Sequence, residues 1–101
     1  MNLKKEYEEQ ISFLEKKADI SFKYLYDKHQ DIFIDIFLNK KLNDDTENKD
    51  ELNILGLYYC YILEDCDKAV IMWLFAIGFG SVDALVNLGN YYLDIGNNEG
   101  R

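Results

Sequence analysis

An eight-residue pattern occurs twice in this chain and constrains its fold more than any other feature. Residues 52–59, Leu-Asn-Ile-Leu-Gly-Leu-Tyr-Tyr, return at 85–92 as Leu-Val-Asn-Leu-Gly-Asn-Tyr-Tyr, a shift of 33 residues. The five identical positions of the eight are all apolar, aromatic or glycine, the residue types that decide how helices pack. A repeat of this length is typical of stacked helical hairpins. We therefore expect an all-α chain, a short right-handed α-α superhelix of about five helices.

The segment between the two copies predicts the second helix of such a hairpin. We expect a first helix over 51–63 and its partner over 67–79. On the partner, Ala69, Trp73 and Ala76 fall on one face, where a large ring stands between small residues. That alternation lets two helices interlock closely around the indole.

Two glycines inside the predicted helices indicate where neighbouring helices come close. A glycine in a helix interior costs about 1 kcal/mol relative to alanine. Gly56 nevertheless returns one period later as Gly89. We therefore predict a close approach of a neighbouring helix at both positions.

Capping residues mark the ends of these helices. Asn48 followed by Glu51 resembles a capping box that opens the helix over 51–63. Gly80 suits the left-handed conformation that ends a helix, and Ser81 can cap the next. That last helix is expected over 82–95, ending at Gly96.

The first half of the chain predicts two further helices. Apolar residues at steps of three and four predict a helix of about seven turns from Leu3 to Leu25. The stripe consists of Tyr7, Ile11, Leu14, Ala18, Phe22 and Leu25, widened by Phe13, Ile20 and Tyr24. A coiled coil is the alternative, although the Lys and Glu residues keep no clean heptad register.

Residues 32–38 suit either a helix or a buried strand. Their β-branched and aromatic side chains favour a strand, but nothing else in the chain could pair with one. We therefore expect a helix over 31–42, capped by Asp31 and antiparallel to the first. The predicted organisation is one domain: an N-terminal hairpin over 1–42, a polar loop over 43–50, and one and a half repeats over 51–101.

The repeat half resembles the Sel1-like branch of the tetratricopeptide (TPR) repeats. Two features depart from that family: the chain has no proline, and its second copy stops after one helix. The residues that carry the resemblance are Leu55, Gly56, Tyr59, Ala69, Trp73, Ala76, Gly80, Ala84, Leu88, Gly89 and Tyr92.

The resemblance implies a non-catalytic scaffold that holds peptides or proteins on a concave face lined by the first helices of successive hairpins. An asparagine on this face can bind a peptide backbone, and leucine and tyrosine offer apolar contact. The alternative is that the N-terminal helices cover these residues or that they are merely solvated. By helical geometry the candidate residues are Asn53, Leu57, Tyr61 and Glu64, and one period later Val86, Asn90, Leu93 and Asp94.

The net charge of −8 is concentrated in the repeat half and restricts the partner. Residues 31–101 carry five Lys or Arg against thirteen Asp or Glu, whereas residues 1–30 carry six of each sign. Such a field repels phosphate backbones and anionic lipid, so we expect no nucleic acid and no membrane as partner. A basic peptide or protein is the expected partner.

No arrangement of residues predicts catalysis, a metal site or a cofactor. His29, the only histidine, lies in a charged turn where a solvated side chain is expected. Cys60 and Cys66 match no zinc spacing, and we expect free thiols in a reducing, cytoplasmic location. The acidic clusters at 43–47 and 64–67 lack the spacing and glycine of a calcium loop, and are expected to be a solvated loop and helix caps. We therefore expect no enzyme.

Two other functions remain open. The first is self-assembly through the last helix, since repeat arrays normally finish with a polar capping helix and this one does not. The second is a shortened member of a longer repeat family, with no activity of its own. On the last helix, the residues expected to cover the hairpin are Leu85, Leu88, Tyr92 and Ile95, and those expected to stay uncovered are Val86, Tyr91 and Leu93.

Overall fold

The computed structural model describes residues 2–17 and 20–99, and this part of the chain contains helices and no strand. The all-α prediction is therefore confirmed, as is the choice of helix over strand for residues 32–38. The elements in chain order are α1 (Leu3–Lys17), α2 (Ile20–Lys28), α3 (Gln30–Phe33), the π-helix η1 (Ile34–Leu38), α4 (Lys49–Tyr61), α5 (Cys66–Gly78) and α6 (Val82–Glu99).

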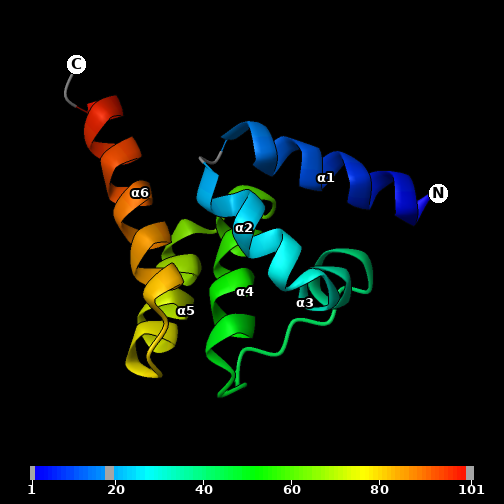
Figure 1. The fold of residues 1–101 in the computed structure, drawn as a ribbon. Coiled ribbons are helices and arrows are strands. Elements are labelled where there is room, and N and C mark those ends of the chain that lie inside the picture. The colour runs from blue at the N-terminus through cyan, green and yellow to red at the C-terminus, as the bar shows by residue number, and fades with distance from the viewer. Residues whose placement is uncertain (1, 18–19, 100–101) are drawn as a thin grey trace.

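Helix α4 occupies the centre of the molecule, as Figure 1 shows. Helices α5 and α6 lie on one side of it, and α1, α2 and α3 lie on the other. Every residue of α4 from Leu52 to Cys60 is buried, including Gly56 and Asn53. The core is therefore continuous across the repeat half and the N-terminal half.

The helices of the repeat half begin and end close to their predicted positions. Their caps explain why: the Asn48 carboxamide accepts bonds from the N–H groups of Asp50 and Glu51 at 2.9 and 3.1 Å. The reciprocal half of the predicted capping box is made differently, because the Asn48 N–H bonds the Thr46 hydroxyl at 3.1 Å. The prediction of Asn48 as the N-cap is confirmed.

The two later helix starts are capped in the same way. Asp65 accepts a bond from the Lys68 N–H at 3.2 Å and opens α5. Gly80 adopts a φ of +99°, in the left-handed region that ends α5, and Ser81 then accepts the Ala84 N–H at 3.0 Å. The predicted end of α6 at Gly96 is wrong, since α6 continues to Glu99. The rest of the predicted tail, residues 100 and 101, lies outside the described residues.

The N-terminal half differs more from the prediction. The structure has two helices, α1 and α2, where a single helix was expected from Leu3 to Leu25. Ala18 lies outside the described residues, as does the side chain of Ile20. The expected antiparallel hairpin over 1–42 is therefore a set of four short elements. Phe13 and Tyr24, expected to widen the buried stripe, are exposed. The stripe itself is confirmed at Tyr7, Ile11, Leu14, Phe22 and Leu25, all of which are buried.

The second predicted helix, over 31–42, is shorter and begins differently. It forms α3 and η1 and ends at Leu38. Asp31 is not its cap, because the N-cap position belongs to His29 and no side chain bonds the free N–H groups there. The helix ends because Lys40 takes a φ of 59° and its ammonium bonds the Phe37 carbonyl at 2.8 Å.

The two equivalent glycines have different surroundings. A Cβ atom at Gly56 would overlap the indole of Trp73, so the predicted close approach is confirmed there. The indole is fully buried, and its Nε1 donates to the Asn53 carbonyl at 3.0 Å. At Gly89 nothing lies within 4 Å of such a Cβ, so the same prediction is wrong. The reason is that α6, unlike α4, has no following helix against this position among the described residues.

Candidate binding surface

The predicted concave face is largely covered where it lies on α4. Asn53 and Leu57 are both buried. The Asn53 side-chain oxygen accepts a bond from the Asn87 amide at 2.8 Å, and its backbone carbonyl accepts the bond from Trp73. Asn53 therefore joins α4 to α5 and α6 instead of facing a partner, whereas the alternative set out for this face was cover by the N-terminal helices.

The remaining residues of that face are split between the turn and α6. Tyr61 and Asn90 are half-buried, whereas Glu64 and Asp94 are exposed. Burial, followed by the charges of Cys60 and Asp94, raises the pKa of Tyr61 to about 12.

One side chain of α2 lies near the N-terminal half of α6. Leu25 of α2 shares with Asp83, Val86 and Asn87 a gap of only about 10 Å³, which is at the lower limit for one water molecule. Leu25 itself is buried. A side chain of the N-terminal half therefore reaches the candidate residue Val86, which is still 41% exposed.

Helix α6 is rotated relative to its predicted orientation. Ala84 and Leu88 face the core and Tyr91 is half-buried against Trp73, with ring centroids 6.0 Å apart. Leu85 and Tyr92, expected to cover the hairpin, are exposed instead. The third expected side chain, Ile95, lies outside the described side chains, and Val86 and Leu93 are uncovered as expected.

An acidic pocket of about 260 Å³ lies between the loop before α4 and the end of α5. Phe75 and Phe79 form its apolar wall, and they are 52% and 50% exposed. Three carboxylates and a hydroxyl complete it, so that charge and exposed aromatic surface meet at one place. The pocket residues are Asp44, Asp45, Thr46, Glu47, Phe75 and Phe79.

The loop of the acidic pocket is held in place by Asp44. Its carboxylate accepts the Tyr59 hydroxyl at 2.6 Å and pairs with the Lys68 ammonium at 2.8 Å. Burial alone would raise the pKa of Asp44, but the bonds from Lys68 and Tyr59 outweigh burial and hold this pKa below its usual value. Lys68 also lies over the Tyr59 ring, 4.8 Å from its centroid. Asp45 and Glu47 are exposed and have no such pair among the described residues.

A second groove, of about 380 Å³, runs along α1. Its lining mixes one lysine with two glutamates, so it has no dominant charge. The exposed ring of Phe13 provides its main apolar contact. This groove indicates no particular ligand.

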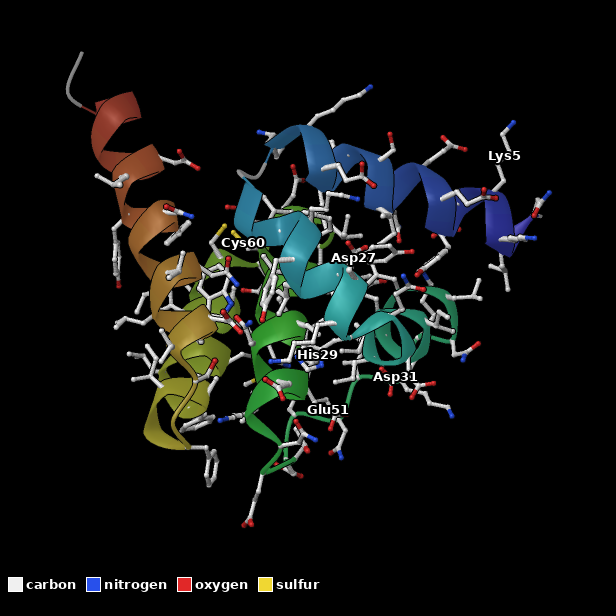
Figure 2. All side chains as sticks on the ribbon, in the orientation of Figure 1. Lys5, Asp27, His29, Asp31, Glu51 and Cys60 are labelled. Carbon is white, nitrogen blue, oxygen red and sulfur yellow. The ribbon has the colours of Figure 1, made fainter. Side chains whose placement is uncertain are left out.

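His29 is placed differently from the prediction. It is half-buried, not solvated, and its Nε2 lies 3.7 Å from the carboxylate of Asp50 in the first turn of α4. Cys60 belongs to the last turn of α4, about 15 Å further along the helix, and Figure 2 shows the two residues at different ends of that helix. The thiol and the imidazole are therefore too far apart to form a Cys–His pair.

The described residues contain no group of three or more His, Cys, Asp or Glu that could hold a metal ion. Nor does any helix in residues 2–17 and 20–99 combine the length and the apolar character needed to cross a membrane.

Comparison of the chain with protein-family models, curated proteins and solved structures found no match. The resemblance to the Sel1-like repeats therefore stays a prediction from the residues of the repeat half.

Sequence reasoning did not predict the acidic pocket, although the spacing of its two phenylalanines can be read from the sequence. Phe75 and Phe79 are four residues apart, and both are exposed, whereas Ala69, Trp73 and Ala76 are buried. That spacing places two aromatic rings together on the outer face. The position of the acidic loop beside them depends on the Asp44 bonds and could not be read from spacing.

Proposed function

We propose that this chain is a non-catalytic protein-binding module, a short helical array of the Sel1-like, TPR-like type that binds a basic peptide or protein. Two features support the array. The α4–α5 hairpin is locked by Trp73 against Gly56, and α6 carries the second copy of the α4 pattern. In this proposal α6 is the first helix of a second unit.

The acidic pocket is the observation that carries the proposed partner. A lysine or arginine side chain could place its charged end beside Asp45 and Glu47 and its stem or guanidinium on the rings of Phe75 and Phe79. Contacts of a cation with an aromatic face contribute about 0.5–1 kcal/mol at exposed sites. Several such contacts are needed for binding, which favours a basic peptide over a single amino acid.

The charge of the repeat half favours the same class of partner. Thirteen acidic residues against five basic ones over 31–101 attract a cationic surface over distances of about 8 Å at physiological ionic strength. The pocket therefore lies within a field that increases the rate of encounter with a basic peptide.

A titration with a short arginine- and lysine-rich peptide that also contains leucine tests the proposal. We expect the backbone amides of Glu47, Phe75 and Phe79 to shift in two-dimensional NMR spectra as peptide is added. The double variant Phe75→Ala with Phe79→Ala should weaken binding about tenfold, a loss of about 1.4 kcal/mol. Both side chains are half-exposed, so the fold should tolerate their loss.

Two further double variants separate the pocket from general charge attraction. Asp45→Asn with Glu47→Gln should also weaken binding about tenfold. Glu8→Gln with Glu15→Gln removes the same charge from the exposed face of α1 and should change binding much less. Equal losses in the two charge variants, or unchanged binding when both phenylalanines are removed, would show that the pocket is not the site.

Self-assembly through α6 is the second candidate function. It is favoured by the exposed apolar side chains of that helix, of which Leu93 is 65% exposed. Sedimentation of the wild-type chain and of Leu93→Lys tests it. A wild-type dimer that the lysine variant abolishes would support self-assembly, and a wild-type monomer at high concentration would exclude it.

A further inference from the structure

Two thiols from different helices meet at the turn between α4 and α5. Cys60 lies in the last turn of α4, and Cys66 is the first residue of α5. Their Sγ atoms are 3.1 Å apart, and the Cys66 thiol also lies 3.8 Å from the Cys60 carbonyl oxygen. Both cysteines are free. The two sulfurs are therefore in direct contact without being bonded.

The backbone of the turn holds the thiols in this contact. The Asp65 N–H donates to the Tyr59 carbonyl at 2.8 Å, and the Leu63 N–H donates to the Tyr58 carbonyl at 3.1 Å. Glu64 takes a φ of 56°, which reverses the chain between the helices. None of these bonds involves sulfur, so the thiols stay adjacent in either oxidation state.

The two thiols differ in access to solvent. Cys60 is buried, and this burial raises the pKa of its thiol, with a smaller contribution in the same direction from Cys66. The carboxylate of Asp94 also raises that pKa, whereas the ammonium of Lys17 lowers it. Cys66 is only half-buried. An oxidant in solution therefore reaches Cys66 first.

We propose that Cys60 and Cys66 are a redox site that forms a reversible intrachain disulfide with low-molecular-weight disulfides of the glutathione type. The Cys66 thiolate attacks one sulfur of the oxidised reagent, forms a mixed disulfide and releases one reagent thiolate. The Cys60 thiolate then attacks the Cys66 sulfur and displaces the second. The two cysteines lose two electrons, the reagent disulfide gains them, and the thiol protons end on the two released thiols.

Helix α6 lies next to this site and would respond to the reaction. Burial, followed by the charge of Cys66, raises the pKa of Tyr91 to about 12. Tyr91 in turn packs on Trp73. A disulfide has no ionisable thiol, so oxidation removes the charge of Cys66 that acts on Tyr91 of α6. The redox site is thereby linked to the helix that carries the second copy of the repeat.

Titration of the full chain with mixtures of reduced and oxidised glutathione tests this inference. After thiol trapping, intact mass should show one species that has lost two hydrogens and takes up no trapping reagent. Proteolytic mapping should join the peptides that contain Cys60 and Cys66. Mainly mixed disulfides with glutathione, or disulfide-linked dimers, would overturn the proposal.

Single serine variants test the order of the steps. In Cys60→Ser, Cys66 should keep one glutathione as a mixed disulfide, because no second thiol displaces it. Cys66→Ser leaves Cys60 unmodified under the same conditions, since it is buried. Faster modification of Cys60 than of Cys66 would refute the assigned order. Should a serine variant not fold, the wild-type mass measurement decides by itself.

Discussion

Changing Gly56 and Gly89 separately to alanine tests how α5 packs against α4, because the same methyl group meets different surroundings at two equivalent positions. Both glycines lie inside helices, so at each of them alanine should favour the helix by about 1 kcal/mol. At Gly89 nothing opposes this gain, since nothing lies within 4 Å of the new Cβ. We therefore expect Gly89→Ala to raise the free energy of unfolding by about 1 kcal/mol.

At Gly56 the added methyl group would overlap the indole of Trp73. That ring cannot move towards solvent, because it is fully buried and its Nε1 is bonded to the Asn53 carbonyl at 3.0 Å. Overpacking of a core costs about 1–3 kcal/mol, and overlap with a rigid ring places this site near the upper end. After the gain in helix propensity, Gly56→Ala should lower the free energy of unfolding by about 2 kcal/mol. The two variants should then differ by about 3 kcal/mol, a difference from which the propensity cancels.

Urea unfolding measures this difference directly. Circular dichroism follows the helices, and tryptophan fluorescence follows the packing site itself, because Trp73 is the only tryptophan. In thermal unfolding each kcal/mol corresponds to a shift of about 4–8 °C in the midpoint for a chain of this size. If Gly56→Ala were as stable as Gly89→Ala, the close contact between α4 and α5 would not exist and the hairpin described here would be incorrect.

Three further substitutions test local features. Asn48→Ala should lower the free energy of unfolding by about 1 kcal/mol, measured in urea, because α4 loses a side chain that caps two of its N–H groups. Asp44→Asn should make the free energy of unfolding fall less steeply in acid. The pKa of Asp44 in the folded chain lies below 3.8. Its stabilising bonds to Lys68 and Tyr59 are therefore fully present above that pH and are lost as the pH falls further. Tyr61→Phe should reduce the loss of stability in alkali, because the folded pKa of Tyr61, about 12, exceeds its ordinary 10.0 and favours the folded chain until the pH rises through that range.

Each of these three has a result that would contradict it. An unchanged urea midpoint for Asn48→Ala would mean that the cap does not stabilise α4. An acid-unfolding curve for Asp44→Asn that is parallel to that of the wild type would show that the carboxylate bonds do not form in solution. Equal alkaline unfolding of Tyr61→Phe and wild type would show that Tyr61 is not buried.

The acidic pocket and the cysteine pair lie at different ends of the α4–α5 hairpin. The pocket uses the C-terminal end of α5, and the thiols lie at its N-terminal end. The proposed binding and the proposed redox reaction can therefore be separated by experiment. The pocket variants should leave disulfide formation unchanged, and the cysteine variants should leave peptide contacts at Phe75 and Phe79 in place.

Features that depend on neighbouring residues along the chain could be predicted from the amino-acid sequence. The repeated pattern predicted α4, α5 and α6, and Asn48, the acidic cluster at 64–67 and Ser81 were expected to cap their starts. Local hydrogen bonds and the helical period act within a few residues, so these features can be read directly. The repeated glycine predicted a close approach that the structure has at Gly56 and lacks at Gly89.

The tertiary structure alone decided which faces of these helices are covered. Gly56 and Gly89 stand in the same local pattern, yet a ring packs on the first and nothing packs on the second. Asn53 lies on a face that spacing marked as a candidate binding face, and Asn87 and Trp73 bond to it from two other helices, where it is buried. Burial and contact depend on segments far apart in the chain, whose positions follow from the packing of the whole core and not from any local pattern.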